Sequence, residues 1–131
     1  IKAALCTNKK VIAVIGSAID SYYPKENIDL FNEILKAGGL IISEYPPGTP
    51  INPDNFRFRN RIIAGISNAV FVGEGYLKSG TKITISYALD YNKSIGCLPY
   101  QCYQKSYCNQ LIKEGAALIE NENDILDLLN Y

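Results

Sequence analysis

The sequence predicts an α/β protein with a doubly wound, mainly parallel sheet. Short, continuous apolar runs alternate with longer segments whose apolar residues recur at helical spacing. Strands that are apolar throughout are typical of parallel sheets covered by helices on both faces. The 131 residues, 47% of them hydrophobic and 20% charged, are enough for one globular core. We therefore expect residues 1–131 to form a single domain.

Two strands are predicted in the first half of the chain. The apolar run 11–15 ends at Gly16, and the run 40–43 follows a helix expected over about residues 25–37, which a Gly-Gly pair ends. The first five residues read as the tail of a helix, and position 1 is not methionine. These features predict that the chain is a segment of a longer protein.

The second half continues the alternation of strands and helices. Four prolines between residues 44 and 55 indicate an ordered loop, after which one helix is expected to about Ser67. The elements predicted after it are strand 69–73, helix 81–91 with Ile85, Ala88 and Leu89 facing inward, strand 94–98, a short helix near 110–114, an edge strand over 116–119 and a final amphipathic helical segment over 124–130.

The predicted topology indicates where a ligand would bind. We expect the strands 11–15, 40–43, 69–73 and 94–98 to be adjacent and parallel, with helices on both faces. Ligands of such sheets lie beyond the carboxyl ends of the strands. The loops to search are therefore 16–24, 43–57, 73–80 and 98–108.

The arginines form the first candidate site. Of thirteen Lys and Arg residues, the only three arginines, Arg57, Arg59 and Arg61, lie within five positions. Because the net charge is zero, binding of a polyanion must come from a local patch, and the guanidinium fork suits phosphate. On one helix Arg57 and Arg61 would share a face, at a helix start that disfavours cations. The structural alternatives are a solvated helix start or arginines that hold the loop 43–55 through Glu44.

The second candidate site is the loop from residue 73 to residue 81, which leads from a strand into a helix. Backbone N–H groups at such a junction bind anions, Ser79 and Thr81 can donate hydrogen bonds, and Lys82 adds charge beside Gly80. The alternative is that the loop only turns the chain. The spacing is not that of a P-loop, and no G-x-G-x-x-G follows the first strand, so we expect no nicotinamide or flavin cofactor.

Cysteine and histidine usage argues against a metal centre. The four cysteines show no C-x-x-C spacing and the chain has no histidine. We therefore expect that Cys97, Cys102 and Cys108 bind no zinc and form no obligatory disulfide, and that no catalytic triad exists. No apolar run reaches the roughly 20 residues of a membrane span, and no signal peptide is recognisable. These observations predict a cytoplasmic protein with no membrane partner.

Five ordered motifs resemble the DprA/Smf DNA-processing family. They are residues 23–27, 43–50, 59–67, 79–84 and 109–116, and the resemblance extends from Ile1 to about Leu126. It implies part of a Rossmann-like three-layer sandwich that binds single-stranded DNA without base specificity. It also implies that the protein loads the RecA recombinase during natural transformation and has no catalytic centre and no cofactor. The sequence leaves open whether it forms a homodimer.

The resemblance also suggests binding residues. The phosphate-binding arginines of the family correspond to Arg59 and Arg61, on either side of Asn60, and the helix-start contacts correspond to Ser79, Gly80 and Thr81. Arg57 falls at a variable position of the pattern. Bases would stack on loop aromatics, for which the candidates are Tyr22, Tyr23, Tyr45, Tyr76 and Phe56.

The chain departs from the family pattern at several places. The first strand, its Gly-Ser-Arg turn and a following glycine motif would precede Ile1. Tyr100 and Cys108 stand where the family has glycine, and Gly75 stands where alanine is usual. A loop that has lost two glycines must follow a different path.

Two other functions are consistent with the sequence. Nucleotide hydrolases of the lonely-guy type carry a glutamate in the helix that follows a similar loop, but here Thr84 occupies that place and no positioned acid or base remains. Release of base from a nucleoside monophosphate would identify that activity. The third class is a nucleotide sensor or a protein-interaction module.

Overall fold

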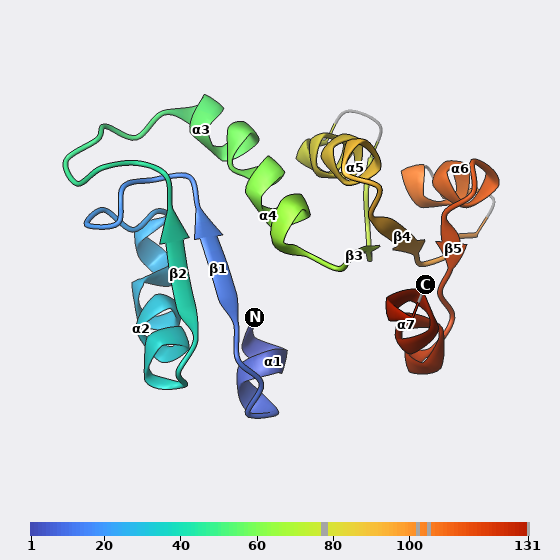
Figure 1. Cartoon of the computed structure of the whole chain (residues 1–131), viewed down its shortest axis with the longest axis horizontal. Coiled ribbons are helices and arrows are strands. Elements are labelled where there is room, and N and C mark those ends of the chain that lie inside the picture. Colours follow the sequence, from blue (N-terminus) through green and yellow to red (C-terminus); the bar gives the residue numbers. More distant parts are fainter. Residues whose placement is uncertain (77–78, 102, 105, 131) are drawn as a thin grey trace. The chain divides into compact units, whose positions relative to one another are not determined.

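The computed structural model describes residues 1–76, 79–101, 103–104 and 106–130. The chain divides into two compact units, Ile1–Arg59 and Asn60–Tyr131, and each contains its own parallel sheet (Figure 1). The expectation of one domain, with all the long strands adjacent in one sheet, stays a prediction.

The first unit is a two-stranded parallel sheet covered by a helix. Strands β1 (Ile12–Ile15) and β2 (Leu40–Ser43) pair in register, with Ile12 opposite Leu40 and Ile15 opposite Ser43. The helix α2 packs on the sheet through two buried residues, Phe31 and Ile34. The elements are α1 (Lys2–Cys6), β1 (Ile12–Ile15), the 3-10 helix η1 (Lys25–Asn27), α2 (Ile28–Lys36), β2 (Leu40–Ser43) and α3 (Pro53–Phe58).

The segment after the proline-rich loop differs from the prediction. The helix α3 begins at Pro53, two residues before the predicted end of the loop, because the Asn52 side chain accepts a hydrogen bond from the backbone N–H of Asp54 and proline suits the first helical position. The expected single helix is also two helices, since α3 ends at Phe58 and α4 begins at Asn60. The prediction that Arg57 and Arg61 share one helix face assumed a single continuous helix, so it does not hold for two helices.

The second unit contains a three-stranded parallel sheet in the order β3 (Ala69–Val72), β4 (Ser94–Cys97) and β5 (Ala117–Leu118). Val70 lies opposite Ile95, and Cys97 pairs with Leu118 on the edge strand. The strand positions predicted from the apolar runs are confirmed. The elements are α4 (Asn60–Ile66), β3 (Ala69–Val72), α5 (Gly80–Asp90), β4 (Ser94–Cys97), α6 (Tyr107–Lys113), β5 (Ala117–Leu118) and α7 (Glu122–Leu129).

Helices cover both faces of this second sheet (Figure 1). On one face, Ile95 and Cys97 join a buried cluster with residues of α4, α5 and α6. Gly96 points to the opposite face, where a Cβ would lie 2.8 Å from side-chain atoms of Ile119 and of Leu128 in α7. Alternation along β4 therefore separates the α5–α6 layer from the α7 layer.

Two details of the second unit correct the sequence analysis. Ile85 and Ala88 are buried as predicted, but Leu89 is 60% exposed, because one helical step turns it away from the sheet. The helix α6 begins at Tyr107 and not near residue 110, since the Ser106 side chain accepts a hydrogen bond from the Cys108 N–H and caps the helix earlier.

In the part of the chain that the structure describes, no helix has the length and apolarity to cross a membrane.

Candidate nucleic-acid interface

In the first unit, Arg59 is anchored at the carboxyl end of β1. Its guanidinium donates a hydrogen bond to the carbonyl oxygen of Val14 and lies 5.9 Å from the centre of the Phe56 ring. Phe56 in turn packs so closely on Gly16 that a Cβ there would lie 2.8 Å from the ring. Desolvation by burial lowers the pKa of Arg59, but a guanidinium stays charged in proteins. Arg59 is therefore a positioned cation at the end of the strand where ligands bind.

The loops that follow β1 and β2 are tied together around this end. The Ser43 hydroxyl donates to the Ser17 carbonyl at 2.6 Å, and the Gly48 N–H donates to the Asp20 carboxylate at 3.0 Å. The Ser17 hydroxyl is buried and has no hydrogen-bond partner among the described residues. Sequence reasoning did not find Ser17, because a serine after a strand carries no distinguishing pattern.

Arg57 has a different setting from the one predicted. It is exposed and lies in the last turn of α3, where a cation interacts favourably with the helix dipole. The prediction that Arg57 lies at a helix start, where a cation is unfavourable, was wrong, because α3 ends one residue after it. Arg57 therefore needs no compensating anion.

In the second unit, the starts of α4 and α5 meet. Asn60, which is 9% exposed, donates from its side-chain nitrogen to the carbonyl oxygen of Gly80 at 3.5 Å. Asn60 is the first residue of α4 and Gly80 is the first residue of α5. The half-buried Arg61 follows directly on α4. The structure thus brings the second half of the Arg-Asn-Arg motif to the Ser-Gly-Thr motif, which sequence order alone does not show.

The start of α5 is open to a ligand. The Ser79 hydroxyl does not cap the helix but donates to the Tyr76 carbonyl at 2.8 Å. Among the residues that the structure describes, the backbone N–H groups of Gly80 and Thr81 have no hydrogen-bond acceptor, and Lys82 is exposed in the same turn. A Cβ built on Gly80 would meet no atom of the described residues within 4 Å. This arrangement can accept an anion at the positive end of the helix.

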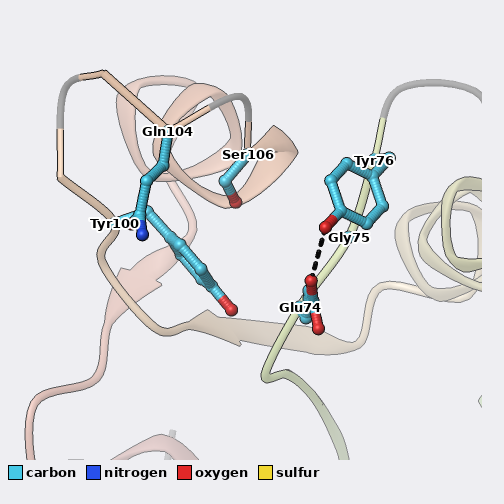
Figure 2. Close-up of a pocket in the computed structure, with 6 residues that line it drawn as sticks. All are labelled: Glu74, Gly75, Tyr76, Tyr100, Gln104 and Ser106. Carbon is cyan, nitrogen blue, oxygen red and sulfur yellow. Dashed lines mark hydrogen bonds between the residues drawn. The ribbon is translucent and has the colours of Figure 1, made fainter.

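A pocket of about 250 Å³ lies between the loops that follow β3 and β4 (Figure 2). The Tyr76 hydroxyl donates to Glu74 at 2.6 Å, and the Tyr100 hydroxyl donates to the Gly73 carbonyl at 2.8 Å. The hydrogen bond to Glu74 raises the pKa of Tyr76, and desolvation raises the pKa of Tyr100, so both rings stay neutral. The lining residues are Glu74, Gly75, Tyr76, Tyr100, Gln104 and Ser106.

Sequence reasoning found only part of this pocket. Tyr76 was one of five aromatic candidates, whereas the remaining lining residues were not expected to act together. The available signals were Tyr100, which stands where the resembled family has glycine, and Gly75, which stands where alanine is usual.

The described cysteines do not form a metal site. Cys6 is exposed and free, while Cys97 and Cys108 are buried and free. Desolvation and the neighbouring Cys108 raise the pKa of the Cys97 thiol to about 12. Within the described ranges, no three His, Cys, Asp or Glu residues converge as a metal would require. Cys102 lies outside those ranges, and the absence of zinc stays a prediction.

Comparison with known proteins identifies relatives along the whole chain. Residues 1–130 match the family described as DNA recombination-mediator protein A. Protein Smf from Synechocystis is 44% identical over 95% of this chain and 31% of its own length. DNA processing protein DprA from Streptococcus pneumoniae is 37% identical over 95% of this chain and 44% of its own length. The chain therefore spans less than half of the length of these relatives.

Solved structures agree with the sequence comparison. The X-ray structure of DprA from S. pneumoniae matches with a TM-score of 0.86 and 37% identity, covering 96% of this chain and 45% of that one. DNA processing protein A from Helicobacter pylori, solved to show its mode of binding single-stranded DNA, matches with a TM-score of 0.81 and 30% identity, covering 91% of this chain and 55% of that one. The predicted α/β class with parallel sheets is confirmed as part of the Rossmann-like domain of these proteins. The chain therefore belongs to the DprA/Smf family of DNA recombination mediators.

Proposed function

We propose that this chain is a single-stranded-DNA-binding part of a recombination mediator and that it contacts phosphates without reading base sequence. The observation that carries the proposal is the start of α5, where two N–H groups without an acceptor among the described residues lie beside Asn60, the middle residue of the Arg-Asn-Arg motif. Membership of a recombination-mediator family and the single-stranded DNA bound by the H. pylori relative support it. The proposed contacts are Arg57, Arg59, Asn60, Arg61, Ser79, Gly80, Thr81 and Lys82.

The charge distribution favours short-range contacts. The chain has thirteen basic and thirteen acidic residues, so its net charge does not attract DNA from a distance. Arg61 and Lys82 lie in the first turns of α4 and α5, where the helix ends add positive potential. A phosphate bound there would accept hydrogen bonds from backbone N–H groups and would lie close to two cations. That combination binds any sequence, because the phosphate backbone carries no base information.

Arg59 has both a structural and a binding role in this proposal. Its hydrogen bond to the Val14 carbonyl fixes the guanidinium at the end of β1. Fixing a guanidinium before the ligand arrives reduces the entropy lost on binding. The alanine variant should therefore lose stability as well as affinity, and the two effects must be measured together.

The test replaces Arg59 and Arg61 by alanine in the intact protein. Affinity for single-stranded oligonucleotides should fall about equally for all sequences, and the slope of log affinity against log salt should flatten by roughly 0.7 for each lost phosphate contact. Arg61→Lys should recover only part of the affinity, because an ammonium cannot grip two oxygens. Melting temperatures are measured beside affinities to separate binding from unfolding.

A matched control removes two other positive charges. Lys9 and Lys10 are both exposed in the first unit, and replacing both by alanine changes the net charge by the same amount. This variant should keep both the affinity and the salt slope. A folded arginine variant with full affinity would show that the cluster is scaffolding, and an equal loss in the lysine variant would show that only net charge matters.

Two parts of the proposal go beyond DNA binding. We propose that the intact protein passes the bound strand to RecA, as the resemblance implies, and that it catalyses no reaction. Thr84, half-buried in α5, occupies the place of the hydrolases' glutamate and supplies no carboxylate there. Release of free base from a nucleoside monophosphate by the purified protein would contradict the non-enzymatic function and favour the hydrolase alternative.

A further inference from the structure

Tyr100, in the loop that follows β4, holds the segment 73–76 that leads from β3 toward α5. Its hydroxyl donates a hydrogen bond to the carbonyl oxygen of Gly73 at 2.8 Å, and its ring reaches from its own loop toward that segment (Figure 2). The backbone N–H of Tyr107, the first residue of α6, donates to the carbonyl oxygen of Gly75 at 2.9 Å. Two hydrogen bonds therefore restrain a segment that lies outside any strand or helix.

The backbone of Tyr100 is itself anchored by a helix. The Asn109 side-chain oxygen accepts the Tyr100 N–H at 2.8 Å, and the Asn109 side-chain nitrogen donates to the Tyr100 carbonyl oxygen at 2.6 Å. Asn109 lies in the first turn of α6, so the anchor belongs to a regular element of the second unit. The bond from the Tyr100 hydroxyl to Gly73 thus ties the end of β3 to α6.

The restrained segment packs directly on the start of α5. Gly75 is buried, and a Cβ built on it would lie 3.2 Å from the Cγ2 atom of Thr81, the second residue of α5. The Ser79 hydroxyl donates to the Tyr76 carbonyl oxygen at 2.8 Å and does not cap the helix. A serine that capped the helix would occupy one of the N–H groups that we assign to a phosphate. The position of segment 73–76 therefore keeps the start of α5 open.

We propose that Tyr100 is a positioning residue for the phosphate site at the start of α5. It holds segment 73–76 in the conformation in which the Ser79 hydroxyl leaves the first N–H groups of the helix available to a phosphate. This inference rests on the proposed binding of single-stranded DNA. Tyr100 stands where the resembled family has glycine, which has no hydroxyl to donate, so the restraint is a feature of this chain. Gly75 stands where alanine is usual, and its freer backbone gives such a restraint more to do.

The strength of the Tyr100 hydrogen bond sets the size of the expected effect. One hydrogen bond of this kind shifts an equilibrium by about two- to tenfold. The affinity of a protein falls in proportion to the fraction of molecules that already have the conformation that binds. Removing the hydroxyl should therefore weaken DNA binding by a factor of that size. Because no cation is removed, the salt dependence of the affinity should stay unchanged.

The test replaces Tyr100 by phenylalanine in the intact protein, which keeps the ring and removes only the hydroxyl. Affinity for single-stranded oligonucleotides should fall about two- to tenfold at every salt concentration. Amide hydrogen exchange in the free protein should become faster at Tyr107, whose N–H bonds the Gly75 carbonyl. It should stay unchanged at Leu98, whose N–H bonds the last residue of β3. A general loss of stability would instead speed exchange at both amides.

A matched variant removes a hydrogen bond of the same kind elsewhere in the second unit. The Ser67 hydroxyl, just after α4, donates to the Ile63 carbonyl oxygen at 2.6 Å, and Ser67→Ala should keep full affinity. If Tyr100→Phe binds as tightly as the unaltered protein, loses no more affinity than Ser67→Ala, or leaves exchange at Tyr107 unchanged, the positioning role is refuted while DNA binding stands. A changed salt slope would also refute it, since Tyr100 would then affect a charged contact. If the unaltered protein binds no strand, the proposed function fails and the positioning role fails with it.

Discussion

Replacing Gly80 by valine tests the start of α5 without changing any charge. Within the part of the chain that the structure describes, a Cβ on Gly80 would meet no atom within 4 Å, and the Gly80 backbone does not adopt the left-handed conformation that only glycine tolerates easily. Valine therefore fits the folded protein. Its two methyl groups would stand in the open space in front of the N–H groups of Gly80 and Thr81, where we place a phosphate.

The expected magnitudes separate binding from stability. Valine forms helices somewhat better than glycine, so the substitution should change the free energy of unfolding by only about 0.5 kcal/mol, in the stabilising direction. Blocking one or two hydrogen bonds from backbone N–H groups to a charged phosphate should cost roughly 1.5–3 kcal/mol of binding, or about ten- to a hundredfold in affinity. Because no cation is removed, the salt slope should stay unchanged.

The assay titrates a labelled single-stranded oligonucleotide at several salt concentrations and records a thermal melt of each variant. Gly65→Ala is the control, since Gly65 is an exposed glycine in α4 whose added methyl would lie at an ordinary 3.7 Å from the Tyr91 ring. The control should bind normally. A folded Gly80→Val protein with full affinity would refute the phosphate site at α5. A reduced salt slope would show that the substitution displaced a cation.

Two further predictions concern the core of the second unit. Gly96→Ala should lower the free energy of unfolding by about 1–3 kcal/mol in chemical denaturation, because the added methyl would overlap side-chain atoms of Ile119 and Leu128. An unchanged free energy of unfolding would contradict the packing of α7 on β4. The raised pKa of Cys97 means that the folded state holds the thiol proton more tightly than the unfolded state. The contribution of this thiol to the free energy of unfolding should therefore be fully present below about pH 9 and be lost as the pH rises through about 12. Cys97→Ala should weaken this alkaline decline in urea titrations, and an unchanged slope would assign it to other groups.

The strands were predictable because each is a short run of apolar residues that lies between two segments with helical spacing. The runs at 11–15 and 94–98 contain β1 and β4, each within one residue at either end. Burial on both faces leaves few alternatives for such a run, and period-two patterning is not needed to recognise it. The parallel pairing within each unit then follows from the helices that separate the strands.

Two of the errors concern the residue at which a helix begins or ends. The arginine segment reads as one helix, yet α3 ends at Phe58, and this moves Arg57 from a helix start to a helix end. In the same way, the Ser106 cap starts α6 earlier than its apolar spacing suggests. A helix cap depends on a single hydrogen bond, which helical periodicity does not encode, and helix boundaries are the least certain part of any pattern.

The candidate site was predictable as two motifs but not as a geometry. The Arg-Asn-Arg and Ser-Gly-Thr segments each stand out in the sequence, whereas the contact between Asn60 and Gly80 depends on how α4 and α5 pack. The pocket between the loops after β3 and β4 was less predictable still, because Glu74, Tyr100 and Gln104 belong to two loops with no common motif. Residues that meet only through tertiary structure leave no signal in a single sequence.

The zero net charge of residues 1–131 predicts what kinetic measurements on this part of the protein should show. A protein with a strongly positive surface gains association rate from long-range attraction, and that gain is lost as salt rises. Here thirteen cations balance thirteen anions, and the basic groups near the start of α5 act only within about 10 Å at ordinary salt. The salt dependence of affinity must therefore come from contacts formed in the complex. Removing Arg61 should accordingly change the dissociation rate more than the association rate.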